Sequence, residues 1–487
     1  MKIAIVGFGV SGAALLKSLK VTGKLNENIQ VDLFDPNDEP AVGLAYGKDS
    51  THLLLNAFPT AMSLNPEDKE EFSKWLEEHY PQYNAKIDLV PRQIFGEYAK
   101  EVLTPLLEYE NVRHYRKEII DVTLNDGSSE SYLLKDSTNQ QYGEYDYLFL
   151  AVGNPPYNDF YHLNGHENYI KDPYPVLEKL KDLKEDNRIA IIGSSLTAFD
   201  LVNYLSHEKN LKHPLGIFTV VPYFNSLRVH PYQGPALSYS LDSQWMDKHI
   251  QKYSGNIPLD RIIQRIKKDL RDNAIDLSAI RKHYDPANLK GTYQAYFNQE
   301  HPELSKLQAY ISLLSGYLAD LYMSLSKEEQ TRYHSEYAPL FSHYQVRLAP
   351  AAVKNMYQMW TKNDLFIVPD LKEISPSNPL ILKSQAGKIY EADLIINATG
   401  FDFNTHHISD EDSLIKKLLN KGFLLDKEQR GILVSWPESQ VMNQRHGLLE
   451  NCFFIGPWIS NTHYANNSVS ALVKKAYDVI KNHMNDE

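Results

Sequence analysis

Two stretches of the chain repeat one pattern of apolar and polar positions. Each begins with an apolar run of strand length, passes through a turn of small residues and continues as an apolar helical segment; they span 3–16 and 188–205. A buried strand that turns into a helix is typical of dinucleotide-binding units, because the helix N-terminus offers free N–H groups and a positive dipole end to a pyrophosphate. The pattern therefore predicts two Rossmann-like units.

The first turn carries a complete G-x-G-x-x-G motif at Gly7, Gly9 and Gly12. Gly7 permits the tight turn, Gly9 lets phosphates approach the backbone, and Gly12 lets the helix pack on the strand. We expect the turn residues Val10 and Ser11 to contact the same dinucleotide. The alternative is a glycine-rich turn that binds nothing, but a strand before the motif and a helix after it favour binding.

An alternating segment at 29–35 follows the first helix and ends in Asp35, 23 residues after Gly12. An acid at the end of the second strand of such a unit accepts hydrogen bonds from an adenosine ribose. We therefore expect Asp35 to contact the cofactor. The alternative is a solvated loop acid before Pro36.

The second turn departs from the glycine motif. It reads G-x-x-x-x-A, with Ser195 in place of the second glycine and Ala198 in place of the third. Serine side chains can themselves donate hydrogen bonds to a phosphate. We expect this turn to bind the second nucleotide through Gly193, Ser194, Ser195, Leu196 and Thr197.

The next strand of the second unit, at 216–221, ends in Pro222 and carries no acid. An Asp or Glu that would read the ribose 2′-hydroxyl is therefore absent from that position. Arg228 follows six residues later, and an arginine near this place accommodates the 2′-phosphate of NADP. The chain is thus predicted to prefer NADPH, although Arg228 in a plain surface loop is an open alternative.

Composition narrows the classes of function. The net charge of −12 does not favour nonspecific nucleic-acid binding. The single cysteine, Cys452, excludes an internal disulfide, a cysteine zinc site and a redox cysteine pair, and we expect it to be a core residue. The N-terminal segment lacks a signal-peptide pattern, and no apolar run is long enough for a membrane span. We expect a cytoplasmic protein with no metal site, and an oligomer is possible.

Four further segments carry a family resemblance. They read GLAYG at 43–47, HLLLN at 52–56, MSLNP at 62–66 and RQIFGEY at 92–98. Together with GFGVSG they resemble the bacterial FAD/NAD(P)-binding protein family of the YdhS type, related to two-domain N-hydroxylating flavoprotein monooxygenases. The resemblance implies FAD in the first unit and NAD(P)H in the second. It also implies that FAD is lined by Tyr46, Asn56, Met62, Ser63 and Arg92.

Two later strands, at 145–154 and 392–401, end in small-residue turns. They resemble the segments at which such flavoproteins pass between domains, which places Gly153, Thr399 and Gly400 at the cofactors. The resemblance also puts Gly456 and the start of the terminal helix, near Asn467, beside the flavin. The residues alone leave alternatives open. Arg92 could be a surface cation, and residues 53–55 could simply be core. The strand before Gly456 and the terminal helix could be a core strand and a packing helix.

Apolar residues recur at helical spacing through 259–270 and 304–321. We therefore expect an α/β fold with two Rossmann-like domains and a helical insertion at 236–345. The FAD-binding domain is discontinuous, at 1–157 and 398–487, and the NAD(P)H-binding domain is inserted, at 158–235 and 346–397.

These expectations lead to an FAD-dependent, NAD(P)H-consuming oxidoreductase. We expect a monooxygenase that hydroxylates a small amine or other nucleophile through a C4a-hydroperoxyflavin. The alternatives are a flavin-dependent reductase or dehydrogenase of a small organic acceptor, and a flavin-binding redox-sensing regulator. The expected partner is a small-molecule substrate, and no catalytic residue is assigned: His52, His230 and His463 lie nearest the expected site elements, but a lone histidine is more often structural.

Overall fold

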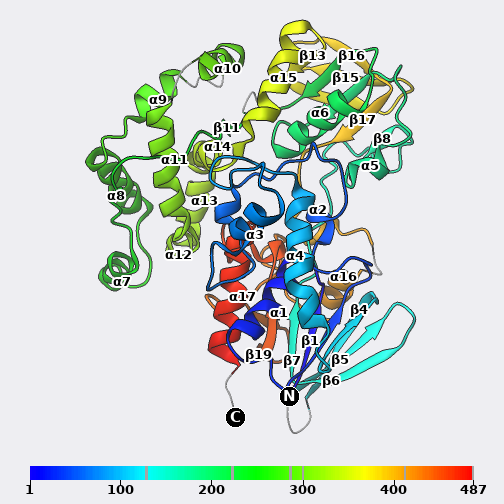
Figure 1. Cartoon of the computed structure of the whole chain (residues 1–487), viewed down its shortest axis with the longest axis vertical. Coiled ribbons are helices and arrows are strands. Elements are labelled where there is room, and N and C mark those ends of the chain that lie inside the picture. The colour runs from blue at the N-terminus through cyan, green and yellow to red at the C-terminus, as the bar shows by residue number, and fades with distance from the viewer. Residues whose placement is uncertain (127–129, 221–223, 284–287, 299–300, 411–412, 485–487) are drawn as a thin grey trace. The chain divides into compact units, whose positions relative to one another are not determined.

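The computed structural model describes residues 1–126, 130–220, 224–283, 288–298, 301–410 and 413–484 (Figure 1). The chain forms two compact units. The first contains Met1–Asp49, Ala57–Pro156 and Phe401–Glu487, and the second contains Ser50–Asn56 and Tyr157–Gly400. The expected fold class, an α/β protein with a discontinuous first domain and an inserted second one, is confirmed.

A six-stranded sheet forms the centre of the first unit, in the order β18-β19-β7-β1-β2-β3. All neighbouring pairs are parallel except β18 and β19. After its exposed first residue, Lys2, the strand β1 is apolar and buried, as expected for a parallel strand covered on both faces. The bounds are β1 (Lys2–Val6), β2 (Gln30–Phe34), β3 (Val112–Tyr115), β7 (Tyr147–Leu150), β18 (Gln440–Asn443) and β19 (Gly447–Phe454).

Helices and a small sheet complete the first unit. The first and last long helices, α1 (Val10–Val21) and α17 (Val469–His483), pack against each other. The antiparallel sheet comprises β4 (Ile119–Asp126), β5 (Glu130–Asp136) and β6 (Gln141–Tyr145). The other helices are α2 (Gly43–Tyr46), η1 (Pro59–Ala61), α3 (Glu71–His79), α4 (Arg92–Leu107), η3 (Thr405–His407), α16 (Leu414–Asn420) and η4 (Pro457–Ile459).

A five-stranded parallel sheet forms the centre of the second unit, in the order β13-β10-β9-β17-β8. Its strands are β8 (Tyr169–Ile170), β9 (Ile189–Ile192), β10 (Leu215–Phe218), β13 (Leu365–Val368) and β17 (Leu394–Asn397). The helices α5 (Val176–Lys179), α6 (Leu196–Glu208) and α15 (Pro350–Lys362) and an antiparallel sheet of β14 (Leu371–Ser375), β15 (Leu380–Ser384) and β16 (Ile389–Ala392) accompany it.

The described elements between 236 and 345 are all helices, as the apolar spacing predicts. They are α7 (Ser243–Lys252), α8 (Leu259–Asp272), α9 (Leu277–His283), α10 (Leu289–Asn298), α11 (Pro302–Ser315), α12 (Leu318–Met323), α13 (Lys327–Glu336) and α14 (Ala338–Gln345). A short parallel ribbon joins the two ends of this insertion. It pairs β11 (Ser226–Leu227), which precedes the helices, with β12 (Arg347–Leu348), which follows them.

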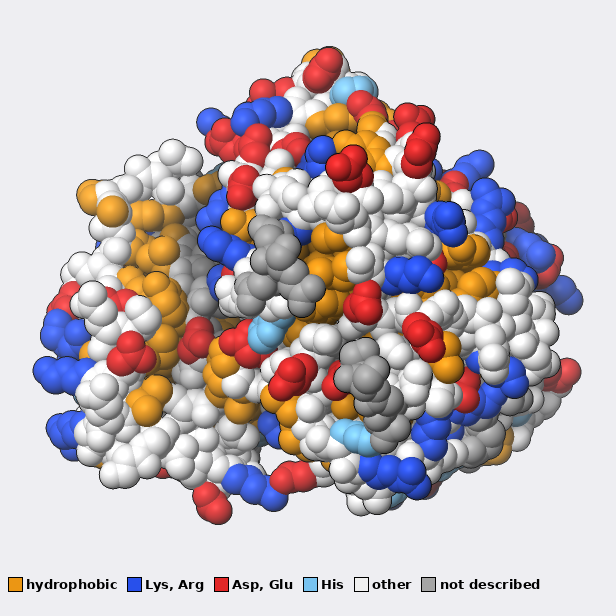
Figure 2. All heavy atoms as spheres, turned by 90° about the horizontal axis from the view of Figure 1, so that it is seen from below, with side chains coloured by type: hydrophobic (Ala, Val, Ile, Leu, Met, Phe, Trp, Pro, Cys, Tyr) orange, Lys and Arg blue, Asp and Glu red, His pale blue; other side chains and the backbone are white. Residues whose placement is uncertain are grey.

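Acidic and basic side chains are interspersed over the face seen in Figure 2. Within the described residues, none of the helices combines the length and the apolar character that crossing a membrane requires.

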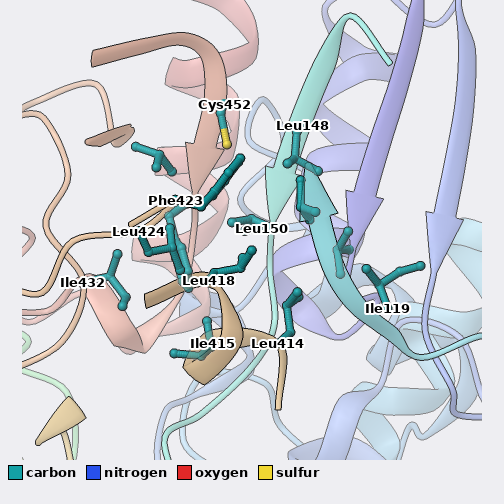
Figure 3. Close-up of a cluster of buried hydrophobic side chains, with 14 of the residues drawn as sticks. Ile119, Leu148, Leu150, Leu414, Ile415, Leu418, Phe423, Leu424, Ile432 and Cys452 are labelled. Atoms are coloured by element: carbon teal, nitrogen blue, oxygen red, sulfur yellow. The ribbon is translucent and has the colours of Figure 1, made fainter. Parts of the chain in front are cut away.

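An apolar cluster joins the main sheet of the first unit to its small sheet and to α16 (Figure 3). Leu148 and Leu150 on β7 and Leu418 on α16 belong to this cluster, and all three side chains are fully buried. Cys452 on β19 belongs to the same cluster, and burial raises the pKa of its thiol well above the ordinary value. The predicted core role of Cys452 is therefore confirmed.

Candidate functional site

The first glycine turn is held by backbone packing that tolerates no side chain. The Gly7 amide donates to the Phe34 carbonyl at 2.8 Å, and Gly7 has a φ of +97°. A Cβ atom on Gly7 would lie 2.1 Å from the Ala151 carbonyl oxygen, and one on Gly12 would lie 2.2 Å from the Gly7 carbonyl oxygen. The predicted reasons for these two glycines, a tight turn and close helix–strand packing, match this geometry.

Gly9 has a different environment. A Cβ atom there would lie 3.4 Å from the Gly43 Cα atom, which is an ordinary contact distance, and the φ of Gly9 is −78°. The fold alone therefore does not require glycine at this position. Close approach of phosphates to Gly9 stays a prediction, and it is the reason that remains for a glycine there.

Asp35 is buried rather than solvated, so the alternative of a free loop acid is wrong. Its Oδ2 atom accepts a hydrogen bond from the Phe8 amide at 2.7 Å, and its Oδ1 atom accepts from the Asn37 amide at 2.9 Å. The carboxylate thus ties the end of β2 to the glycine turn. Oδ1 also accepts from the Asn37 side-chain amide at 2.7 Å, so the predicted ribose contact would use the second lone pair of Oδ2.

Three predicted residues meet at the carboxyl edge of the first sheet. Strands β1, β7 and β19 are neighbours and parallel, so the turns that follow them lie at one edge. A Cβ atom on Gly456 would lie 3.9 Å from both the Gly153 carbonyl oxygen and the Ser11 hydroxyl. Gly153 has a φ of +82° and open space where a side chain would stand. A cleft-forming edge of this kind is where parallel α/β sheets bind ligands.

The start of the terminal helix lies beside the same edge. Asn466 donates its Nδ2 to the Gly456 carbonyl at 2.9 Å, while its buried Oδ1 atom has no partner among the described residues. The helix α17 begins at Val469, with Ser468 as its N-cap, so the start is two residues later than the predicted Asn467, which is exposed. The unsatisfied amide oxygen and the open space at Gly153 fit a bound polar group.

Tyr46 and Arg92 come together where α2 packs on α4. A Cβ atom on Gly96 would lie 2.0 Å from the Tyr46 carbonyl oxygen, and the Tyr46 ring lies 4.7 Å from that of Phe95. Burial raises the pKa of the Tyr46 hydroxyl, and the positive charge of Arg92 opposes that rise. Arg92 is the first residue of α4, where the helix dipole favours an anion.

Met62 and Ser63 form a buried turn with structural bonds of its own. The Ser63 hydroxyl donates to the Asp68 carbonyl at 2.7 Å and accepts from the Asn65 amide at 3.0 Å. The next amide, Leu64, donates to the Tyr98 hydroxyl at 3.0 Å. The Ser63 hydroxyl therefore has a role within the turn, and its predicted contact with FAD stays a prediction.

The segment Ser50–Asn56 groups with the second unit, although the segments on either side of it belong to the first. Leu53 is buried in the core of the second unit, which confirms the interpretation of Leu53 as core. The His52 carbonyl accepts from Asn203 Nδ2 at 3.0 Å, and the Asn56 carbonyl accepts from the Arg228 guanidinium. The proposed contact of Asn56 with FAD stays a prediction.

The second turn repeats the packing of the first. The Gly193 amide donates to the Phe218 carbonyl at 2.8 Å, and a Cβ atom on Gly193 would lie 2.2 Å from the Ala398 carbonyl oxygen. Ser195 has a φ of −106°, which serine adopts without strain. Its hydroxyl donates to Asn225 Oδ1 at 2.9 Å. Serine thus replaces glycine at a position whose backbone dihedral angles are accessible to any residue.

The other residues of this turn open α6. Ser194 lies at the end of β9, with its hydroxyl 3.4 Å from that of Thr219. Leu196 and Thr197 form the first turn of α6 and are half-buried. The N-terminus of α6 therefore lies at the carboxyl edge of the second sheet, as the binding prediction requires.

Asn397, which the sequence analysis did not single out, organises the second crossover. Its Oδ1 atom accepts from the amide and hydroxyl of Thr399, and its Nδ2 atom donates to the carbonyls of Asn158 and Lys171. Gly400 follows with a φ of +86° and open space around it. The available signal was a polar residue at the end of an otherwise apolar strand.

Arg228 is half-buried, and its amide donates to the Leu348 carbonyl at 2.9 Å. It therefore directly follows β11 and extends the β11–β12 ribbon by one hydrogen bond, and its contact with a 2′-phosphate stays a prediction. Within the described part of the chain, no group of three or more His, Cys, Asp or Glu side chains is arranged to hold a metal ion.

Two sheets, one wholly parallel and one parallel except for its edge strand β18, each carry a strand–turn–helix element at the carboxyl edge, and this arrangement is a fold with two dinucleotide-binding units. Residues 4–155 match the family model described as FAD-NAD(P)-binding. No curated protein matches the chain by sequence.

Solved structures share the fold over almost the whole chain. Ornithine hydroxylase from Pseudomonas aeruginosa is 13% identical, with 98% of this chain and 97% of that chain covered and a TM-score of 0.55. L-lysine 6-monooxygenase from Pseudomonas syringae is 12% identical, with 98% of each chain covered and a TM-score of 0.54. The cadaverine monooxygenase of Erwinia amylovora is 14% identical, with coverage of 98% and 93% and a TM-score of 0.53.

Proposed function

We propose that the chain is an FAD-dependent, NAD(P)H-consuming monooxygenase that hydroxylates a small amine or other nucleophile. The observation that carries this proposal is the repeated turn. In each unit the amide of the first glycine, Gly7 or Gly193, donates a hydrogen bond to the last residue of the next strand. Each of these glycines also lies close to an alanine carbonyl, that of Ala151 or Ala398. One such turn serves one dinucleotide, so two turns suit a flavin and a nicotinamide.

The fold comparison supports the proposed reaction class. The three structures named above are an ornithine hydroxylase and two amine monooxygenases, and the chain shares their fold over 98% of its length. The likeness is one of fold, so the choice of an amine as substrate rests on this proposal. Cys452, the single cysteine, is buried, which argues against the reduction of disulfides by this chain.

In the first unit, FAD would be held by the glycine turn and by the groups around it. The α1 N-terminus and Gly9 suit the pyrophosphate, and Asp35 suits the ribose. The open space at Gly153 would admit a flat ring against the backbone, with Gly456 beside it, and Arg92 would meet an anion of the cofactor or substrate. When bound, FAD accepts hydride from reduced nicotinamide and supplies the electrons for oxygen chemistry.

In the second unit, the N-terminus of α6 would bind the pyrophosphate of the nicotinamide dinucleotide. Gly193 and the Ser195 hydroxyl lie at that helix start, and Thr399 and Gly400 follow the adjacent strand β17. Arg228 would accommodate a 2′-phosphate, which makes NADPH the expected reductant. The protein thereby binds and orients both cofactors, and a catalytic side chain is not required for hydride transfer.

The test is NADPH oxidation by the purified, FAD-loaded full-length protein, with ornithine, lysine and cadaverine as separate substrates. We expect at least one amine to accelerate NADPH oxidation and to yield a hydroxylamine in proportion to the NADPH consumed. Hydrogen peroxide as the only product with every amine would contradict the proposal. Oxygen-independent turnover with a quinone would instead identify a reductase, and tight FAD binding with slow turnover would favour a redox-sensing regulator.

A further inference from the structure

The β11–β12 ribbon places three polar side chains on one face. Ser226 pairs with Arg347 and Leu227 pairs with Leu348, and the Arg228 amide extends the ladder to the Leu348 carbonyl. Paired residues of parallel strands point to the same side, and successive residues alternate. Ser226, Arg228 and Arg347 therefore share one face, while Leu227 and Leu348 are buried on the other.

The two guanidinium groups on this face are close enough to influence each other. Burial, together with the charge of Arg347, lowers the pKa of Arg228 to about 9, and burial lowers the pKa of Arg347 to about 10. Both therefore remain charged at neutral pH. Two like charges in partly desolvated surroundings repel each other, and an anion between them would relieve that repulsion.

The partners of Arg347 are neutral. Its guanidinium donates to the Gln308 carbonyl at 2.7 Å, the Ser312 hydroxyl at 3.2 Å and the Tyr344 carbonyl at 3.4 Å, and no carboxylate faces it among the described residues. The neighbouring Ser226 hydroxyl is buried and has no hydrogen-bond partner within the same described set. Two cations and an unused hydroxyl are the donor set that a phosphate monoester requires.

This face adjoins the second nucleotide turn. The Ser195 hydroxyl contacts Asn225, and Arg228 lies three residues further along the chain. Three residues of extended chain span at most about 10 Å, so a single dinucleotide bound at the turn can reach the face. Gln308 of α11 holds the ribbon in place: its Nε2 donates to the Leu227 carbonyl at 2.5 Å, and its Oε1 accepts from the Val229 amide at 3.2 Å.

We propose that Ser226, Arg228 and Arg347 together bind the 2′-phosphate of NADPH, and that the helical insertion serves this site by delivering Arg347. The inference rests on the proposed use of a nicotinamide dinucleotide in the second unit. It goes beyond Arg228 alone, because the second arginine comes from the far end of the insertion. A bidentate arginine and a hydroxyl would then distinguish NADPH from NADH.

Binding of 2′,5′-ADP and ADP to the full-length protein tests the site without any flavin chemistry. Calorimetry should show tighter binding of 2′,5′-ADP than of ADP. Arg347→Gln should lower the affinity for 2′,5′-ADP by about 10- to 100-fold, as expected when a charge-assisted hydrogen bond is lost. The affinity for ADP should stay unchanged. Arg261→Gln, an exposed arginine of α8 in the same insertion, removes the same charge and should change neither affinity.

Ser226→Ala provides a variant that keeps both charges, and it should weaken 2′,5′-ADP while ADP binding stays constant. Circular dichroism of each variant checks that it is folded. Equal binding of 2′,5′-ADP and ADP by the wild type, or equal losses for both in Arg347→Gln, would overturn the inference. Inorganic phosphate that binds as tightly as 2′,5′-ADP would also overturn it, in favour of a free-phosphate site. Failure of flavin reduction by both NADH and NADPH would contradict the proposed function separately.

Discussion

A pair of alanine substitutions in the first turn separates what the fold needs from what the cofactor needs. A Cβ atom at position 12 would lie 2.2 Å from the Gly7 carbonyl oxygen, whereas one at position 9 would lie 3.4 Å from the Gly43 Cα atom. Both positions carry glycine, and both lie in the same motif. We predict that Gly12→Ala destabilises the first unit and that Gly9→Ala leaves its stability nearly unchanged.

The magnitude for Gly12→Ala follows from the distance. The methyl group would need about 1.2 Å more room to reach the 3.4 Å of an ordinary contact, and the neighbouring atom is backbone that no rotamer change can move. Forcing extra atoms into a packed site costs about 1–3 kcal/mol. Alanine inside a helix recovers at most about 1 kcal/mol relative to glycine. The free energy of unfolding should therefore fall by about 1–2 kcal/mol.

Gly9→Ala should act on the cofactor instead. If phosphates approach the backbone at Gly9, the added methyl group meets their oxygens, and we expect FAD to bind at least about tenfold more weakly, equivalent to about 1.4 kcal/mol. Urea unfolding followed by circular dichroism measures the stability of both variants. Titration of the apoprotein with FAD, followed by flavin fluorescence, measures the affinity.

Two results would refute this reasoning. A Gly9→Ala protein with wild-type stability and wild-type FAD affinity would show that Gly9 does not face the phosphates. A Gly12→Ala protein as stable as the wild type would show that α1 and β1 are not as closely packed as the structure indicates. Val21→Ala, at the opposite end of α1, is a control that adds no atoms, and it should keep FAD affinity near that of the wild type.

Three further substitutions test individual contacts. Tyr98→Phe removes a hydroxyl that accepts a hydrogen bond from the Leu64 amide and donates one to Glu71. It should lower the free energy of unfolding, measured in urea, by about 1–3 kcal/mol. An unchanged free energy of unfolding would contradict the importance of these two hydrogen bonds. Burial lowers the pKa of His463 from its ordinary value to about 3, so its neutral form stabilises the fold above pH 6.5 and that stability is lost as the pH falls toward 3. His463→Gln should therefore show a flatter dependence of the urea midpoint on pH between 6.5 and 4, and an unchanged slope would contradict this assignment. Leu53→Ala leaves a cavity in the core of the second unit and should lower its stability by about 2–5 kcal/mol. Hydrogen exchange of the strands of the second unit measures this loss. Faster exchange in the first unit alone would be inconsistent with the structure.

Sequence patterns of short range predicted the parts of this protein that depend on local geometry. The turns at Gly7 and Gly193 were predictable because a strand, a positive-φ residue and a helix start are encoded within a dozen neighbouring positions. The burial of Asp35 against the same turn was not, because the sequence leaves the partner of an acidic group open. Only the structure shows that its carboxylate binds the Phe8 amide.

The sequence by itself determined a two-unit dinucleotide-binding fold with a helical insertion, because glycine spacing and apolar periodicity specify local backbone geometry and burial. The tertiary structure decided which distant groups share a site. It grouped 50–56 with the second unit through burial of Leu53, and it brought Arg347 near Arg228 across the whole insertion by pairing β11 with β12. Neither result follows from local pattern, since nonlocal burial and strand pairing depend on how the complete chain packs.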